Sequence, residues 1–175
     1  TGSPAAVTRP SRDPSPRSIE AFAERWSRKK LIDDPWHQAL IAEAPQVFSA
    51  LASREPNIAR EVRRHASLTA HGMQYFLRES PNHLSSLADL RRYCYFVAGV
   101  VGEMLTSIFA ERNEGLSITP TVRSEARAFG EGLQLVNILK DDLADARRGR
   151  SFMPAGVDRG TLYRLVRRDL LSGQF

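Results

Sequence analysis

The sequence contains a single cysteine, Cys94, among its 175 residues. One cysteine cannot form an internal disulfide, which excludes the disulfide-stapled folds and favours a reducing, cytoplasmic setting. With 11 glycines and 10 prolines, the chain is also unlike collagen or a low-complexity protein. No basic-then-apolar signal segment opens the chain, which begins at Thr1 and stops within an amphipathic pattern at residues 170–175. We therefore expect a cytoplasmic protein whose sequence is incomplete at both ends.

Common catalytic motifs are missing as well. The sequence has no HExxH, CxxC, G-x-S-x-G or P-loop pattern, and its four histidines are not spaced as metal ligands. Zinc chemistry and nucleophilic hydrolysis therefore have no support. The net charge of +5 arises from 25 basic and 20 acidic residues that are spread along the chain, which is weak evidence for a nucleic-acid partner.

Period-two alternation and Asn-Gly hairpin signals are also missing, which argues against strands. Residues 1–18 hold four of the ten prolines together with Ser and Arg, and this composition predicts a flexible loop or tail. From residue 19 to residue 175 the apolar residues recur with a helical period almost throughout. The sequence therefore predicts one all-α domain over residues 19–175.

Helix start and stop signals divide this domain into six expected helices. The sequence predicts breaks or caps at Lys29–Lys30, Asp34–Pro35, Glu55–Pro56, Ser80–Pro81, Ser86, Asn113, Thr119–Pro120, Gly149 and Asp158. Pro45 would lie inside the second helix, where we expect a kink or a break because proline lacks a backbone N–H.

The fifth expected helix, which begins at Thr119–Pro120, carries polar side chains on one face of an otherwise apolar segment. Their spacing of three, four and four residues places them in one row: Gln134, Asn137, Asp141 and Asp145. Buried carboxylates need partners, and oxygen ligands of this kind suit Mg²⁺ shared with substrate phosphates. The alternative is a solvated helix end, at which Arg147 and Arg148 pair with the nearby aspartates.

The fourth expected helix is apolar over residues 93–109, so a transmembrane span has to be considered. Glu103 lies in its middle and arginines flank it closely, which favours a buried helix of a soluble protein. Gly99 and Gly102 are costly in a helix interior and indicate close approach by another helix or by a bulky apolar ligand. Tyr93 would need a partner for its hydroxyl if it were buried.

Two segments of the sequence resemble the squalene/phytoene synthase family. Tyr93–Gly102 (YCYFVAGVVG) is similar to the family's Y-C-x-x-V-A-G-x-V-G helix, and residues 132–154 (GLQLVNILKDDLADARRGRSFMP) are similar to its L-Q-x-x-N-I-x-R-D-x-x-E-D and G-R-x-x-x-P pattern. The separation of the two motifs also matches. A third stretch, His71–Phe76, resembles a Gly-Met helix segment of the family, so the resemblance covers residues 20–172.

The resemblance implies an all-helical bundle around a central cavity and a prenyltransferase that condenses two prenyl diphosphates head to head in isoprenoid biosynthesis. It also implies Mg²⁺ as cofactor, with NADPH in addition if the product is squalene. By position, the resemblance assigns metal binding to Asp141 and Asp145 and proton transfer to Tyr93. The positions that it assigns to substrate binding are Gln134, Asn137, Arg150, Gly99 and Gly102.

Two departures from the family pattern limit this prediction. Lys140 stands where the family has an arginine, and Ala144 stands where it has an acidic residue. The charge of Asp142 can compensate for the acidic residue missing at Ala144. The family's first Asp-rich motif is absent, and we expect it upstream of Thr1. Whether residues 1–175 are active alone therefore stays open.

Two other interpretations remain. The first is a catalytically degenerate family member that binds a prenyl lipid or a partner subunit. The second is a nucleic-acid binder that uses the arginines of residues 147–168. We keep it only as an alternative, because the favoured interpretation expects no nucleic-acid partner. Because the product of the family's reaction is apolar, the resemblance favours peripheral association with a membrane. The sequence predicts neither the chain length of the substrate nor the oligomeric state.

Overall fold

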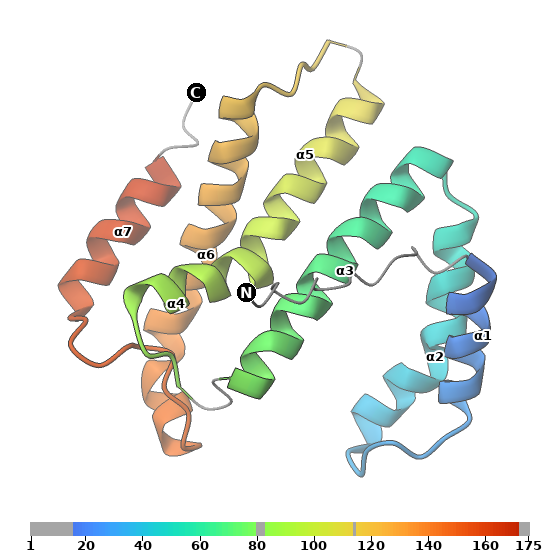
Figure 1. Cartoon of the computed structure of the whole chain (residues 1–175), viewed down its shortest axis with the longest axis horizontal. Coiled ribbons are helices and arrows are strands. Elements are labelled where there is room, and N and C mark those ends of the chain that lie inside the picture. The colour runs from blue at the N-terminus through green and yellow to red at the C-terminus, as the bar shows by residue number, and fades with distance from the viewer. Residues whose placement is uncertain (1–15, 80–82, 114, 172–175) are drawn as a thin grey trace, which may run out of the picture. The chain divides into compact units, whose positions relative to one another are not determined.

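The computed structural model describes residues 16–79, 83–113 and 115–171. The chain divides into two compact units, residues 1–59 and residues 60–175, which are considered separately below. The described residues are helical apart from connecting loops and one isolated bridge (Figure 1), which confirms the predicted all-α class. The proposed tail, residues 1–18, falls mostly outside the described residues, and the first helix begins within it, at Pro16.

The helices follow the expected order closely. Their bounds are α1 Pro16–Ser27, α2 Pro35–Ala52, α3 Pro56–Glu79, α4 Leu87–Cys94, the π-helix η1 Tyr95–Gly99, α5 Val100–Arg112, α6 Pro120–Arg147 and α7 Arg159–Leu171. The stop signal predicted at Ser80–Pro81 lies outside the described residues.

The first unit contains α1 and α2, which pack against each other, and the first turn of α3. α2 begins where its cap signal predicts, because the Asp34 carboxylate accepts a hydrogen bond from the His37 backbone N–H at 2.9 Å. Of the kink or break expected at Pro45, the break is wrong, since α2 continues through this residue to Ala52.

In the second unit α6 is central, because it packs against α4, η1, α5 and α7. Thr119 caps its first turn by accepting a hydrogen bond from the Val122 N–H at 3.2 Å, as predicted. The core of this unit joins side chains from four helices and the loop before α4: Phe76, Leu84, Leu90, Cys94, Leu135, Ile138, Leu139 and Leu162. This packing holds the middle of α6 rigidly against its neighbours.

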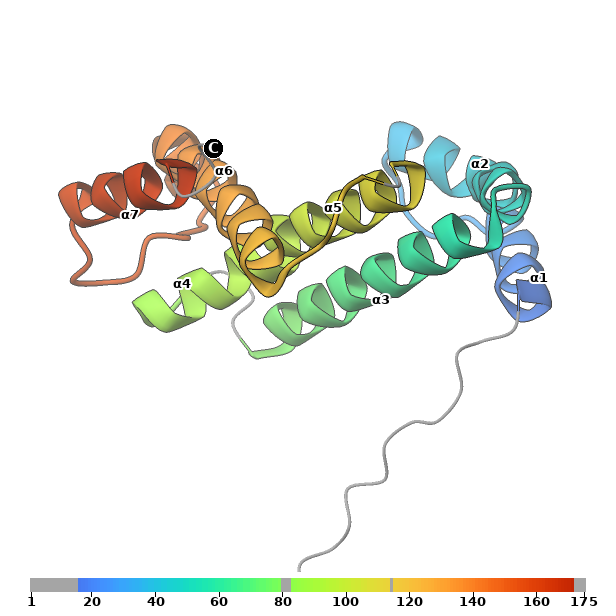
Figure 2. The ribbon, with the colours of Figure 1, turned by 90° about the horizontal axis from the view of Figure 1, so that it is seen from above.

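The expected fourth helix is continuous from Leu87 to Arg112, with α4 leading directly into α5 (Figure 2). Its middle is the π-helix η1, which periodicity did not predict. By length and composition alone this segment could cross a membrane, with a mean hydropathy of 1.5 over its most apolar window. Only 22% of that window is buried in the structure. The prediction of a buried helix therefore holds only for the face that packs on α6, and Val101, Leu105 and Phe109 are exposed.

Candidate functional site

The polar row predicted on α6 lies on one continuous helix. Gln134, Asp141 and Asp145 are half-buried, while Asn137 is exposed. The Asp141 side chain keeps 50% of its surface exposed, and its nearest cation is Lys140, with an Nζ–Oδ1 distance of 3.8 Å. Among the described residues, no basic side chain forms an ion pair with Asp145. Two carboxylates about one helical turn apart therefore remain open to an additional cation.

The turn after α6 folds back onto the last turn of that helix. The backbone N–H groups of Arg148 and Arg150 both donate to the Asp145 carbonyl, at 2.9 and 3.0 Å. Gly149 lies between them with a φ of +71°, a conformation that glycine adopts without strain. This turn keeps Arg150 close to Asp145.

The segment after this turn is tied to the loop before α4. Leu84 donates its backbone N–H to the Ser151 carbonyl at 3.2 Å, and His83 and Ser151 form an isolated parallel bridge. One residue further, the Phe152 ring stacks on Tyr93 with a centroid separation of 5.0 Å. Phe76 of α3 contacts the same tyrosine edge-on at 5.4 Å. Tyr93 is therefore fixed between two aromatic rings.

Tyr93 lies within electrostatic range of the carboxylate end of α6. Burial raises the pKa of its hydroxyl above the usual value, the charges of Cys94 and Asp145 raise it further, and Arg150 acts in the opposite direction. A raised pKa keeps the phenol protonated at neutral pH. The structure therefore brings together three residues that the sequence assigned to one site, Tyr93, Asp145 and Arg150.

Asp142 lies in an ion pair that joins α6 to α7. Arg159, the first residue of α7, donates from Nη1 to Asp142 Oδ2 at 2.9 Å and from Nη2 to the Leu139 carbonyl at 3.0 Å. The charge of Asp142 is thus paired with Arg159, and its compensation for the acidic residue missing at Ala144 stays a prediction. The predicted alternative of a solvated end also differs from the structure, because the partner is Arg159 rather than Arg147 or Arg148.

The donor set at this end of α6 fits Mg²⁺ only in part. Carboxylate oxygens are its preferred protein ligands, and Mg²⁺ is usually bound through one or two carboxylates together with waters and phosphates. Within the described residues, no group of three His, Cys, Asp or Glu side chains could hold a metal ion. Asp141 and Asp145 would therefore hold the ion jointly with phosphate oxygens rather than alone.

Gly99 and Gly102 face α6 in this structure. A Cβ on Gly102 would collide with the Ala126 carbonyl oxygen, and one on Gly99 would contact the side chains of Arg127 and Glu131. Gly130 of α6 makes the reciprocal approach to the Ala98 carbonyl. Close helix contact accounts for these glycines, while their assignment to prenyl-chain binding stays a prediction.

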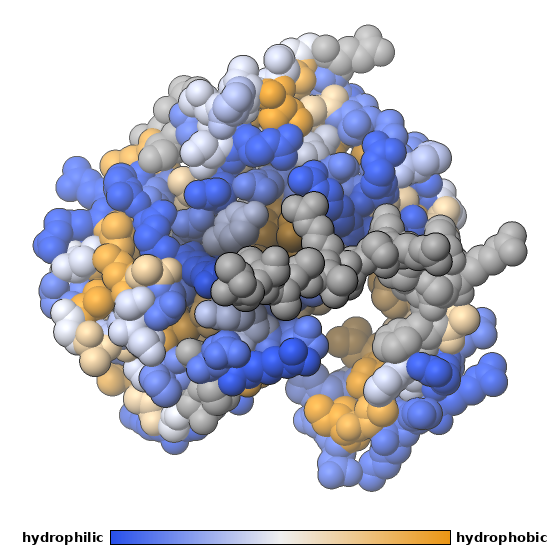
Figure 3. Space-filling view, in the orientation of Figure 1, coloured by the Kyte–Doolittle hydropathy of each residue, from blue (hydrophilic) through white to orange (hydrophobic). Residues whose placement is uncertain are grey.

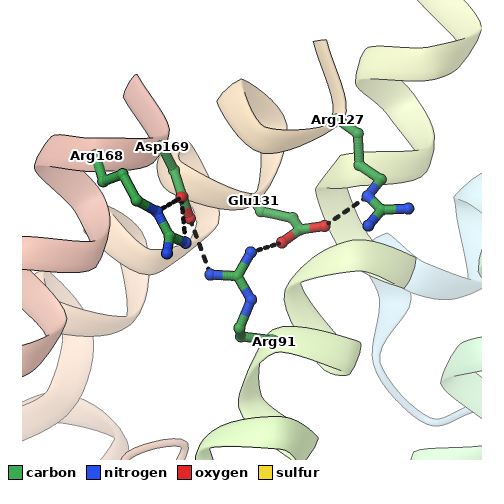
Figure 4. A network of polar contacts seen from close by, with 5 residues as sticks. All are labelled: Arg91, Arg127, Glu131, Arg168 and Asp169. Atoms are coloured by element: carbon green, nitrogen blue, oxygen red, sulfur yellow. Dashed lines mark hydrogen bonds and ion pairs between the residues drawn. The ribbon is translucent and has the colours of Figure 1, made fainter. Parts of the chain in front are cut away.

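A network of charged side chains around the first half of α6 was not predicted from the sequence (Figure 4). Arg91 of α4 donates to Glu131 at 2.8 Å and to Asp169 at 3.3 Å, and thereby joins α4, α6 and α7. Arg127 contacts the other Glu131 oxygen at 3.2 Å, and Arg168 contacts Asp169 at 2.7 Å. Every carboxylate in this network is paired, and the network joins three helices of the second unit.

The comparison with known families matches the whole helical region. A family model described as "Squalene/phytoene synthase" matches residues 12–173. The chain belongs to the squalene/phytoene synthase family. Family membership agrees with the two motifs around Tyr93 and Asp141, and with the placement of both in the second unit.

Curated relatives match a shorter part of the chain. It is 41% identical over 83 residues to phytoene synthase 1, chloroplastic, of Zea mays, a match that covers 47% of this chain and 20% of that protein. It is 36% identical over 102 residues to the phytoene synthase of Arthrospira platensis, covering 54% of this chain and 32% of that protein. The matches therefore span about a fifth to a third of these relatives' lengths.

Proposed function

We propose that the protein containing this chain is an Mg²⁺-dependent prenyltransferase that condenses two prenyl diphosphates head to head, with farnesyl or geranylgeranyl diphosphate as substrate. The names of the relatives, which are phytoene synthases, support a phytoene-type product over a squalene-type product. The expectation of NADPH applied only to a squalene synthase and gains no support from these relatives.

The observation that carries this proposal is the convergence of Asp141, Asp145, Arg150 and Tyr93 at one end of α6. Ionisation of an allylic diphosphate separates a carbocation from pyrophosphate, so the reaction needs positive charge at the leaving group. When bound, Mg²⁺ would supply part of that charge. Arg150 adds a guanidinium that can bind phosphate oxygens in a bidentate manner.

The remaining residues of the row orient the leaving group in this proposal. The amide groups of Gln134 and Asn137 can donate hydrogen bonds to diphosphate oxygens, because they lie on the same face as the aspartates. Tyr93 is protonated, so it enters the reaction as a proton donor or as a relay that releases its own proton when it accepts another. The rings of Phe76 and Phe152 keep this hydroxyl from turning away.

Product analysis tests the proposal. The full-length protein is incubated with farnesyl or geranylgeranyl diphosphate, with Mg²⁺ or with EDTA, and the extract is examined by mass spectrometry. The proposal expects a coupled hydrocarbon or its cyclopropylcarbinyl precursor only in the presence of Mg²⁺. Binding of prenyl diphosphate without any coupled product would instead support a degenerate family member.

The expected product is an uncharged hydrocarbon that partitions into lipid. We therefore include in the proposal that the protein works in the cytoplasm and associates peripherally with a membrane surface. Nucleic acid has no part in this proposal, because the arginine-rich segment that suggested it binds carboxylates through Arg159 and Arg168.

A further inference from the structure

The second unit contains a small cavity beside its network of charged side chains. The cavity has a volume of about 220 Å³, and we call it the arginine pocket. It is lined by Arg91 and Arg92 of α4, Tyr95 of η1, and Arg127 and Glu131 of α6. The first aspartate of the proposed metal site lies ten residues after Glu131, about 15 Å further along α6. Among the described residues, those of the metal site lie outside the lining of this pocket.

The charged network holds two of the three guanidinium groups in place (Figure 4). Arg91 and Arg127 contact the two different oxygens of Glu131, at 2.8 and 3.2 Å. Arg127 uses only its Nε in this contact, and a guanidinium carries five N–H donors. Arg91 uses one nitrogen for Glu131 and another for Asp169. Both arginines therefore keep N–H groups for a further acceptor.

The third arginine, Arg92, has no acidic partner among the described residues. Its guanidinium lies over the Tyr75 ring of α3, with Cζ 4.6 Å from the ring centroid. An aromatic ring orients a guanidinium but does not remove its charge. The guanidinium of Arg127 lies over the Tyr95 ring in the same way, at 5.2 Å. The pocket thus presents an unpaired positive charge that is held in place by an aromatic contact.

The charges around the pocket leave an excess of positive charge. Its lining holds three guanidinium groups and one carboxylate, which leaves an excess of two positive charges. The nearby Asp169 is balanced by Arg168, at 2.7 Å. Burial raises the pKa of Tyr95, on which Glu103 and Arg64 act in opposite directions, so its hydroxyl stays neutral at pH 7. An anion with two negative charges is therefore the best electrostatic match.

A phosphate group fits both this charge and this volume. Its charge at pH 7 is about −1.5 to −2, and its oxygens match the forked N–H groups of a guanidinium. A carboxylate has a single charge and would leave part of the excess in place. Pockets for drug-sized ligands measure roughly 300–1,000 Å³, so this smaller cavity suits one phosphate group rather than a prenyl diphosphate.

The pocket can be reached from water. The Arg91 side chain is 34% exposed and that of Arg127 is 51% exposed, and Arg92 is exposed as well. Figure 3 shows mostly hydrophilic residues, with apolar ones scattered between them, over the part of the second unit that α4 and α7 occupy. A small anion can therefore approach the arginines without a rearrangement of the helices.

We propose that the arginine pocket binds one phosphate group, either of the free phosphate ion or of a small phosphate monoester. The bound group joins Arg92 to the network of Arg91 and Arg127, and thereby links α4 more tightly to α6. Pyrophosphate carries more charge than the pocket neutralises, so without Mg²⁺ it should bind more weakly than phosphate. The proposal does not rest on the proposed function, because none of the residues that line the pocket takes part in the proposed catalysis.

Calorimetric titration with inorganic phosphate tests the proposal. The full-length protein is kept in EDTA at constant ionic strength and without prenyl diphosphate, so that the proposed metal site takes no part. We expect saturable phosphate binding, and a higher unfolding temperature in phosphate than in chloride. Acetate should bind far more weakly, because it has half the charge. Glycerol phosphate distinguishes the two sources of the group: binding as tight as that of phosphate shows that the pocket accepts monoesters, and its failure to bind assigns the pocket to the free ion.

Arg92→Gln removes the unpaired guanidinium and should weaken phosphate binding by about tenfold or more. Because Arg92 is exposed and has no ion pair, the variant should keep its fold, which circular dichroism checks. Arg167→Gln is the matched control, because Arg167 of α7 is also exposed in the second unit but lies outside the pocket. It should leave phosphate binding unchanged.

The proposal is wrong if the wild type shows no saturable phosphate binding, or if Arg92→Gln binds phosphate as tightly as the wild type. An equal loss with Arg167→Gln, or equally tight binding of acetate, would show only a general attraction of anions to a basic protein and would also overturn it. Failure of the synthase assay would refute the proposed function and leave these titrations unaffected.

Discussion

The two halves of α6 carry carboxylates in opposite situations. Glu131 in the first half is 4% exposed and receives Arg91 and Arg127 on its two oxygens. Asp141 and Asp145 in the second half are half-buried, and their only ion pair among the described residues is the long contact from Lys140 to Asp141. The same helix thus carries one carboxylate that is neutralised by two arginines, Glu131, and two carboxylates that have little positive charge near them, Asp141 and Asp145.

This difference separates residues that hold the fold from residues that can bind a ligand. A buried carboxylate is tolerated only with partners, and Glu131 has them from two helices. Carboxylates that keep contact with water can exchange it for a cation and phosphate at little cost. Substitutions at the two halves should therefore have different consequences, on stability for one and on turnover for the other.

The largest effect is expected at the second half of α6. Asp141→Asn or Asp145→Asn in the full-length protein should each lower turnover by about 1000-fold, since each removes charge that binds the metal and diphosphate. Mass-spectrometric product assays measure this, with circular dichroism as the check on the fold. Asp142→Asn is the matched control, because Asp142 pairs with Arg159, and it should keep most of the activity. Equal losses in all three variants would contradict the distinction.

Tyr93→Phe should produce the next largest effect. It retains the contacts with Phe76 and Phe152 but removes the hydroxyl, and we expect a fall of at least ~100-fold in rate. Single-turnover assays at saturating substrate would separate this from weaker binding. Activity within a few-fold of wild type would show that the ring has a packing role only.

Arg91→Ala tests the first half of α6. It leaves Glu131 and Asp169 with less positive charge, and we expect a loss of about 2 kcal/mol in the free energy of unfolding. Burial raises the pKa of Glu131, and Arg91 opposes that rise, so the variant should raise it further. Denaturant titration measures the loss, with Arg92→Ala as the neighbouring control.

The pH dependence of this loss has a defined sign. A carboxyl whose pKa is higher in the folded state than its value of about 4.3 in the unfolded state stabilises the fold below that pH, and the stability is lost as pH rises through the folded-state pKa. The destabilisation by Arg91→Ala should therefore be smaller at low pH than at neutral pH. The opposite trend would mean that Glu131 does not carry the effect.

The smallest effect is expected for Arg159→Gln. Arg159 holds Asp142 and the Leu139 carbonyl, and it thereby fixes the turn of α6 that presents Asp141. This exposed pair contributes little free energy, so the Mg²⁺ concentration for half-maximal activity should rise only a few-fold. A Mg²⁺ titration of activity would detect the change, and an unchanged titration would show that the contact does not position the site.

Local signals in the sequence predicted the helices and the row on α6. Asp34 and Thr119 cap their helices through hydrogen bonds to backbone N–H groups within the first turn, so the cap signals are local. The placement of Asn137, Asp141 and Asp145 on one face follows from the helical period alone. The ion pair of Arg91 with Glu131 joins residues 40 positions apart, so it depends on packing that no local pattern encodes. For the same reason the pairing of Asp142 with Arg159 was not predicted.

The π-helix at Tyr95–Gly99 shows a second limit of local signals. Its residues would also suit an ordinary helix, and the structure has the close approach of Gly130 to the backbone of Ala98 and Gly99 at this point. Such contacts between α6 and the segment before α5 arise only when both helices are in place. Helix periodicity therefore located the segment but not its local geometry.

The central claim is that Asp141 and Asp145 together bind a metal and diphosphate. Calorimetric titration of the full-length protein with inorganic pyrophosphate, with Mg²⁺ or with EDTA, tests it without requiring turnover. We predict binding that needs Mg²⁺ and that disappears in the Asp141→Asn/Asp145→Asn double variant but persists in Asp142→Asn. Equal pyrophosphate binding in EDTA, or by the double variant, would contradict the claim.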